Sequence, residues 1–260
     1  MTRTRIIAAG AVAAVLAIAA FGGWYFLLRD DAPPAVNLAD AVASLTDGTA
    51  APTANATEEP TPSGTPDAST IVTPVATESA GEDGLSGTWT LASGPESFVG
   101  YRVAEELSTV GVTTAVGRTS DIAATLGFDG AAITSVEVDA NLAALESDDD
   151  RRDRTLGRQA LETNTFPRAT FSLTAPIVFD QRPEDGVPIA ASAVGDLTLH
   201  GVTRSVTLAL EGQLVDDRVV VIGSAEVVFA DYDIDPPSAI IVVSVADVGT
   251  FEFQLVFEHS

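Results

Sequence analysis

Apolar and polar residues alternate most clearly along residues 191–210, on either side of the pair His200-Gly201. Glycine suits the positive φ of a two-residue hairpin turn and histidine tolerates it, so this pair is the predicted tip of a β-hairpin. A one-residue slip would reverse the sorting of every side chain, and the pattern therefore selects a single register. On the apolar face this register pairs Leu199 with Val202, Leu197 with Arg204, Gly195 with Val206 and Ala193 with Leu208.

Arg204 is the charged residue on this apolar face. An arginine near the end of a barrel can extend its guanidinium to water or pair with a carboxylate. It can also place a positive charge at the mouth of an apolar cavity. The sequence leaves both interpretations open.

Alternating segments continue from residue 87 to the C-terminus and are typical of β-strands. About eight short strands at this spacing predict an all-β fold, an eight-stranded antiparallel barrel, because closing the sheet removes its exposed edges. The predicted strands lie within 89–103 (a short strand pair), 122–128, 133–142, 169–173, 191–210, 219–229, 239–245 and 250–257.

One segment departs from the strand pattern. Residues 147–150 provide an N-terminal cap and a negatively charged first turn, which predicts a short helix over 151–161, across an end or side of the barrel. Arg151, Arg154 and Arg158 would share one face of this helix. They could hold an anionic head group at a cavity mouth, or form ordinary helical ion pairs with nearby carboxylates.

The N-terminal residues 1–28 have the pattern of a signal anchor. Arg3 and Arg5 precede residues 6–28, an uncharged run that ends in aromatic residues and is long enough to cross a bilayer as a helix. The prediction is a single-pass membrane protein whose C-terminal domain lies outside the cytoplasm. The alternative is a cleaved signal peptide, since residues 17–19 offer small side chains at a cleavage spacing, and the protein would then be secreted.

Residues 29–86 are rich in alanine, threonine, proline, serine and acidic residues, with few large apolar side chains. A chain of this composition cannot bury enough surface to offset its ordering entropy, which predicts a disordered linker. As a flexible coil it would hold the barrel roughly 40 Å from the membrane. The barrel domain is predicted to span 87–260.

Composition excludes several classes of function. The chain has no cysteine, which excludes disulfides, thiolate metal sites, cysteine nucleophiles and a lipid-modified N-terminal cysteine. Its formal net charge of −24 repels nucleic acid and anionic lipid from the chain as a whole. The two histidines, His200 and His259, stand at a hairpin tip and beside the C-terminus, a placement that disfavours a histidine metal site or a catalytic triad.

Residues 231–235 resemble the start of a calcium-binding loop but lack its required residues. Residues 231–235 carry alternating aspartates, but Pro236 stands where the turn glycine belongs and Val242 where the last glutamate belongs. The chain has no glycine-rich phosphate loop and no carboxylate pair with a spacing typical of acid–base catalysis. We therefore expect no metal, no cofactor and no enzymatic activity.

The barrel interior is the remaining candidate site. An eight-stranded barrel either fills with its own side chains or holds one slender ligand. The predicted inward residues mix small side chains, which leave volume, with phenylalanines, which line it. Burying a chain of roughly 30 carbons, at about 0.8 kcal/mol per methylene, would outweigh any polar contact. The predicted lumen residues are Ala124, Leu126, Phe128, Val138, Ala140, Phe171, Leu173, Ala193, Gly195, Leu197, Arg204, Val206, Leu208, Phe251, Phe253 and Leu255.

Residues 195–208, GDLTLHGVTRSVTL, are close to the signature hairpin of the YceI-like family, which the chain resembles from about Gly87 to Phe257. The resemblance implies a lipocalin-like antiparallel barrel, closed by a helix, that encloses an isoprenoid chain such as a quinone tail or a polyprenyl lipid. Supporting similarities lie in residues 89–91, 117–130, 152–156 and 166–171.

Together these features predict a membrane-tethered, extracytoplasmic protein that holds an isoprenoid lipid in an apolar lumen for transport, storage or protection. One alternative is a structural or partner-binding envelope domain with a filled core. Another is an enzyme that acts on a lipid or quinone through buried carboxylates.

Overall fold

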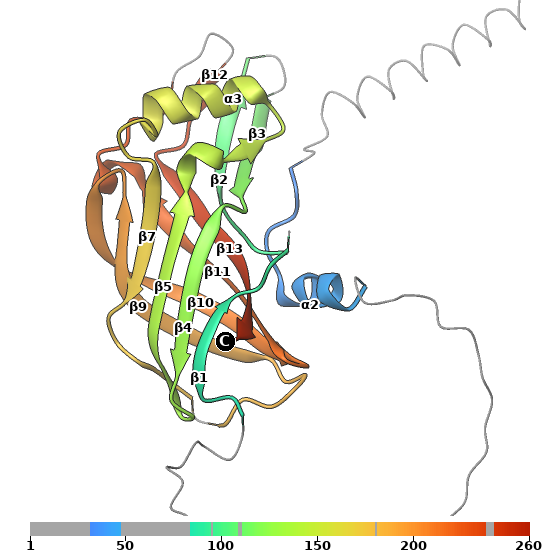
Figure 1. The fold of residues 1–260 in the computed structure, drawn as a ribbon. Coiled ribbons are helices and arrows are strands. Elements are labelled where there is room, and N and C mark those ends of the chain that lie inside the picture. The colour runs from blue at the N-terminus through green and yellow to red at the C-terminus, as the bar shows by residue number, and fades with distance from the viewer. Residues whose placement is uncertain (1–31, 48–83, 95, 109–110, 180, 238–241) are drawn as a thin grey trace, which may run out of the picture.

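The computed structural model describes residues 32–47, 84–94, 96–108, 111–179, 181–237 and 242–260. Eight antiparallel strands in this part of the chain close into a barrel (Figure 1), which confirms the predicted fold class. In order around the barrel they are β1 (Gly87–Leu91), β4 (Ile122–Phe128), β5 (Ala132–Asn141), β7 (Arg168–Leu173), β9 (Ile189–Leu199), β10 (Val202–Val215), β11 (Arg218–Val228) and β13 (Val248–His259), which pairs with β1.

Strand β13 is long enough to pair with two strands placed end to end. Its residue Phe257 lies opposite Leu91 of β1, and Phe253 lies opposite Val99 of β2 (Phe98–Leu107). Strand β2 therefore continues the barrel wall beyond β1 and pairs on its other edge with β3 (Gly111–Thr119).

Strand β3 and the full length of β2 correct the sequence prediction, which placed only a short strand pair in this region. Residues 115–117 of β3 are all buried, so the strand lacks the alternation of apolar and polar residues that marks a half-exposed strand.

Short elements complete the ends of the barrel. The two-residue strands β6 (Glu146–Ser147) and β8 (Ile177–Val178) pair with β3 and β5, and β12 (Val242–Val245) pairs with β2. The 3₁₀ turns η1 (Leu142–Ala144) and η3 (Phe229–Tyr232) lead into β6 and follow β11.

The central hairpin, β9 and β10, has the predicted register. Leu199 lies opposite Val202, and Ala193 lies opposite Leu208. His200 and Gly201 both have positive φ, 52° and 76°, as a type I′ turn requires. The turn and the alternation are both local features, and for this reason the sequence alone predicts the pairing.

The predicted helix is also present, in two parts. Asp149 caps α3 (Asp150–Thr155) by accepting a hydrogen bond from the Arg151 backbone N–H. The chain then widens into one π-helical turn, η2 (Leu156–Ala160), in which the N–H of Leu161 donates to the carbonyl of Leu156. The helix lies across the end of the barrel where β2 and β3 extend (Figure 1).

Helix α2 (Leu38–Asp47) corrects the prediction of disorder for its part of 29–86. Leu38, Ala41 and Leu45 form one apolar stripe and are buried in a cluster that includes Val220 and Val256 on the outside of the barrel. The average composition of 29–86 conceals this stripe, whose spacing is typical of an amphipathic helix. Residues 29–31 and 48–83 of the predicted linker lie outside the described residues.

A buried charge network holds the chain just before α2. Glu252, on the outer face of β13, is 1% exposed and accepts hydrogen bonds from Arg102 at 3.3 Å and Arg118 at 2.7 Å. The same two arginines donate to the backbone carbonyls of Pro33 and Pro34. Residues 32–47 therefore form a strap that is fixed to the barrel wall by both polar and apolar contacts.

The predicted membrane anchor and its alternative cleavage site fall within residues 1–31, outside the described residues. In the described ranges no helix has both the length and the apolar composition needed to cross a bilayer.

Candidate functional site

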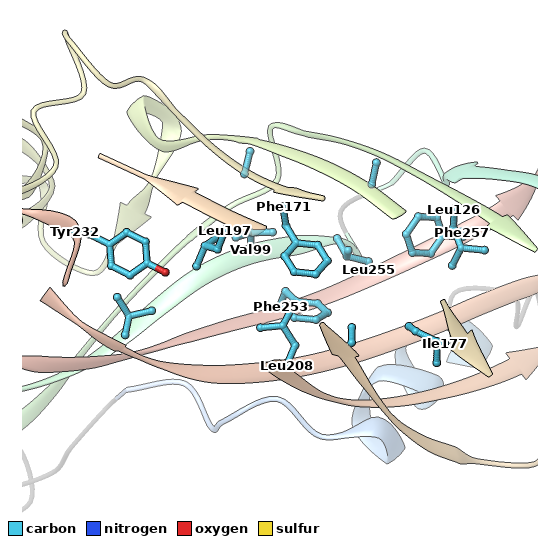
Figure 2. Packing of buried hydrophobic residues seen from close by; sticks show 14 of the residues in the cluster. Val99, Leu126, Phe171, Ile177, Leu197, Leu208, Tyr232, Phe253, Leu255 and Phe257 are labelled. Atoms are coloured by element: carbon cyan, nitrogen blue, oxygen red, sulfur yellow. The ribbon is translucent and has the colours of Figure 1, made fainter. Parts of the chain in front are cut away.

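Apolar side chains cover the inner face of the barrel. Along β13 the residues Phe251, Phe253, Leu255 and Phe257 face inward, as the alternation predicts. Figure 2 shows the row of labelled side chains between the strands, with Phe171 and Phe253 approaching each other from opposite walls. The row begins at Tyr232 and Leu197 and reaches Leu126 and Ile177 at its other end (Figure 2).

Three neighbouring cavities occupy this lumen. The α3-end cavity, about 130 Å³, lies beneath Leu156 of η2. It shares Val99 and Phe251 with the central cavity, about 70 Å³, which in turn shares Leu126 and Ile177 with the β8-end cavity, about 100 Å³. The cavities follow one another along the barrel, so together they form an elongated apolar site.

The α3-end cavity differs from the other two because charged side chains line it. The inward residues of β2 are Val99, Tyr101, Val103 and Glu105, so this strand changes from apolar to polar toward α3. Glu105 is 8% exposed and accepts a hydrogen bond from Arg152 of α3 at 2.8 Å. The pair joins the barrel wall to the helix that covers it.

Tyr101 lies beside this ion pair. Its hydroxyl is buried and has no hydrogen bond of ordinary geometry within the described residues. Burial raises the pKa of Tyr101 to about 12, and the nearby Arg152 offsets only part of that rise. The phenol therefore stays protonated at neutral pH and can act as a hydrogen-bond donor.

Comparison with known families decides what kind of barrel this is. Residues 89–257 match the family model described as the YceI-like domain, a range that runs from β1 to the end of the barrel. The chain belongs to the YceI-like family.

Several solved structures are similar to this YceI-like chain, and the first of them shares its fold. A polyisoprenoid binding domain from Saccharophagus degradans, implicated in plant cell wall breakdown, is 16% identical with a TM-score of 0.53, and the match covers 66% of this chain and 98% of that one. BcnA from Burkholderia cenocepacia is 20% identical, with a TM-score of 0.49 and coverage of 62% and 96%. The YceI protein of Campylobacter jejuni is 16% identical, with a TM-score of 0.47 and coverage of 55% and 84%. No curated protein matches the chain.

Most of the predicted lumen residues lie inside the YceI-like barrel. Those that line a cavity are Leu126, Phe128, Val138, Phe171, Ala193, Leu197, Leu208, Phe251, Phe253 and Leu255. Others lie in the barrel wall or core without lining a cavity: Ala124, Ala140, Leu173, Gly195 and Val206. Their contact with a ligand remains a prediction.

Arg204 is not a lumen residue of this YceI-like barrel, which corrects its inclusion in the predicted lumen set and agrees with the alternative interpretation that its guanidinium extends to water. Its side chain is exposed, and its Nε donates to the backbone carbonyl of Asp231 at 2.9 Å. The residue lies one pair from the hairpin tip, where a long side chain can turn outward to reach η3.

Gly195 also differs from its predicted role. A Cβ at Gly195 would lie 2.3 Å from the ring of Phe171, so the space that the glycine leaves is taken by that ring. The inner-face glycines Gly117, Gly223 and Gly249 likewise leave space that aromatic rings occupy, those of Tyr101, Phe253 and Phe229. Small residues at these positions hold a ring against the wall and do not add empty volume there.

Neither interpretation of the arginine face on the predicted helix is supported. Arg151, Arg154 and Arg158 are exposed and line none of the three cavities. Among the described residues none of them forms an ion pair; Arg158 donates to the Arg154 carbonyl instead. The arginine of α3 that lines the lumen of the YceI-like barrel is Arg152, which does not belong to the predicted face of Arg151, Arg154 and Arg158.

His200, at the tip of the β9–β10 hairpin, is buried at the end of the YceI-like barrel where α3 lies. One ring nitrogen of His200, Nδ1, lies 3.1 Å from the Tyr232 carbonyl, and Nε2 lies 3.0 Å from the Glu162 carboxylate. Phe166 packs edge-on against the imidazole. His200 thus joins β9 and β10 to η3 and to the segment after η2. Within the described residues, no group of three histidine or carboxylate side chains could hold a metal ion.

Sequence analysis missed the Tyr101, Glu105 and Arg152 group. The predicted strand ended at Val103, although the inward period of two continues to Glu105. Extending the period by one step would have found the carboxylate, but its partner Arg152 is 47 residues away along the chain.

Proposed function

We propose that this YceI-like barrel is a binding protein that holds one isoprenoid lipid, a quinone or a polyprenyl chain, in its lumen. The observation that carries the proposal is the row of three apolar cavities along the barrel axis. Each methylene buried there contributes about 0.8 kcal/mol, so a slender hydrocarbon chain matches the site in both shape and chemistry. The Saccharophagus degradans domain, described as polyisoprenoid binding, supports the same ligand class.

The cavity lining favours binding over catalysis. Glu105 is the carboxylate among the lining residues, and it is already held by Arg152. Among the described residues, none of the three cavities has a second lining carboxylate that could share acid–base catalysis with Glu105. For this reason we favour transport, storage or protection of the lipid over its chemical conversion.

We also propose that residues 6–28 anchor the protein in the cytoplasmic membrane with the barrel outside the cytoplasm. The two arginines before the uncharged run and the aromatic residues at its end support this orientation. Cleavage after residue 19 would give a secreted barrel instead.

Mass spectrometry of the full chain, purified from cells that make isoprenoid quinones, tests the lipid proposal. We expect one prenyl lipid per chain in native spectra, released by solvent extraction. Ala193→Phe fills the central cavity and should abolish the bound lipid. Ala190→Phe makes the same change on the exposed face of β9 and should retain it.

Circular dichroism of both variants separates loss of lipid from loss of fold. A folded wild-type protein that carries no lipid and takes up neither quinones nor polyprenols would refute the proposal. That result would favour a filled barrel that binds a protein partner.

A further inference from the structure

We propose that the α3-end cavity seats the polar end of the lipid and selects an uncharged head group that accepts a hydrogen bond, such as a quinone carbonyl or an alcohol, over a phosphate. The inference rests on the proposed lipid-binding function. It adds the orientation of the ligand and the chemical class of its head.

The distribution of polar side chains along the lumen gives the orientation. The polar side chains that line the α3-end cavity on the inner face are Tyr101, Glu105 and Arg152, whereas the central cavity has none within the described residues. In the β8-end cavity the polar residues are Gln213 and Trp89, and the Trp89 indole N–H already donates to the Leu85 carbonyl. A polar head placed in either of the other cavities would lose its hydration without an equivalent set of partners. The hydrocarbon chain therefore extends from α3 toward β8.

The local charges argue against an anionic head. Arg152 is the cation that lines the cavity, and it donates to Glu105, to Asp148 and to the Ser147 hydroxyl. A second carboxylate of the helix, Asp153, accepts hydrogen bonds from the backbone N–H and hydroxyl of Ser147.

Arg152, the cation at the cavity, is thus surrounded by the carboxylates of Glu105, Asp148 and Asp153, whereas Arg151 and Arg154 of the same helix are exposed and line none of the three cavities. A phosphate entering this end would meet net repulsion, strengthened by the low polarity of the lumen. It would also have to displace a carboxylate from Arg152. An uncharged head group avoids both costs.

Tyr101 supplies the hydrogen bond that an uncharged head requires. Its hydroxyl is buried and has no hydrogen bond of ordinary geometry in the described part of the chain; a nearby polar group is the Ser147 side chain, whose hydroxyl already donates to Asp153. Buried polar groups seldom lack a partner, so a ligand oxygen can complete the bonding of this phenol. The ring is positioned by Gly117, since a Cβ at that glycine would lie 2.4 Å from the Tyr101 ring. The donor is therefore held at the cavity wall, where a ligand oxygen can accept from it.

Four ligands with the same prenyl chain test the inference on the full chain: a quinone, a polyprenol, a polyprenyl phosphate and the hydrocarbon without a head. We expect the quinone and polyprenol to bind at least tenfold more tightly than the phosphate. Tyr101→Phe should weaken quinone binding about fivefold and leave the hydrocarbon unchanged, because it removes one hydrogen bond and little volume. Thr207→Val, which removes a hydroxyl from the exposed outer face of β10, is the control and should change neither.

Asp148→Asn tests the charge argument. This side chain is 80% exposed and lines no cavity, but its removal takes away one of the negative charges around Arg152. The variant should reduce the discrimination against phosphate severalfold. Equal affinity of the wild type for phosphate and quinone, or equal losses for quinone and hydrocarbon in Tyr101→Phe, would overturn this inference while the lipid-binding function stands. Failure to bind any of the four ligands would instead refute the lipid-binding function itself.

Discussion

At the scale of single residues, the inner wall is built from glycines that are paired with aromatic rings on neighbouring strands. Tyr101 lies directly opposite Gly117, and Phe253 lies directly opposite Gly223. In both pairs the missing side chain makes room for a ring within the thickness of the wall. The stability of each ring position thus depends on a residue that makes no side-chain contact of its own.

A double-mutant cycle tests this dependence. Gly117→Ala places a methyl group within 2.4 Å of the Tyr101 ring, so it should lower the free energy of unfolding by about 1–3 kcal/mol in urea titrations. In the background of Tyr101→Leu the same substitution should cost much less, because the ring is gone. Equal costs in both backgrounds would contradict the pairing.

At the scale of elements, α3 depends on its N-terminal cap. The backbone N–H of Arg151 donates to the carboxylate of Asp149 at 2.7 Å, and this hydrogen bond lowers the pKa of Asp149 below its ordinary value. A group whose pKa is lower in the folded state stabilises that state above its unfolded pKa. The contribution is lost as the pH falls through the lowered pKa.

We therefore expect Asp149→Ala to cost about 1 kcal/mol of unfolding free energy at neutral pH. The difference from the wild type should shrink as the pH falls through the lowered pKa of Asp149, since the wild-type carboxylate then gains a proton. Urea titrations at neutral pH and at a series of acidic pH values measure it. Asp150→Ala, at an exposed neighbour in the first turn, is the control and should cost less at neutral pH.

The strap formed by residues 32–47 is held to the barrel by the apolar contact of α2. Ala41 is 1% exposed at the contact between α2 and the barrel, whereas Ala43 lies on the exposed face of the same helix. Ala41→Asp should release α2 and make residues 32–47 sensitive to limited proteolysis, because the new carboxylate cannot remain buried without a partner. Ala43→Asp should leave the strap protected. Equal protection of both variants would show that the apolar contact does not hold the strap.

How much of the fold the sequence predicts depends on how local each signal is. The β9–β10 hairpin was predicted to the residue because its turn and its alternation lie within 20 positions. Helix α2 was missed because the average composition of 29–86 conceals its apolar stripe, and because the residues of β11 and β13 that bury this stripe lie far away along the chain. The same distinction applies to the candidate site. The inward phenylalanines of β13 can be predicted from the alternation along one strand. The contact between Glu105 and Arg152 cannot, because the two residues are far apart in the sequence and meet only in the folded barrel.

At the scale of the whole molecule, the strap changes the distance expected between barrel and membrane. The predicted anchor ends at residue 28, and the docked segment begins at Ala32. An extended chain between these positions spans at most about 14 Å, against roughly 40 Å for the whole of 29–86 as a flexible coil. If residues 6–28 cross the membrane, the barrel lies close to the bilayer surface.

Energy transfer in vesicles measures this distance. The chain has no cysteine, so Ser224→Cys on the exposed outer face of β11 provides a single labelling position. Transfer to an acceptor in the lipid should be strong in this variant and weaker when Ala41→Asp is added. Equal energy transfer with and without Ala41→Asp would show that the strap does not determine the distance between the barrel and the membrane.

The glycine and ring pairs also affect how the width of the lumen can change during evolution. Each ring lies in a space left by a glycine on the adjacent strand. The width of the lumen therefore depends on pairs of residues and not on single residues. Replacing a glycine alone pushes a ring into the ligand path, and replacing a ring alone opens a gap in the wall. Barrels of this kind should therefore adapt to thicker or thinner ligands through coupled substitutions on neighbouring strands.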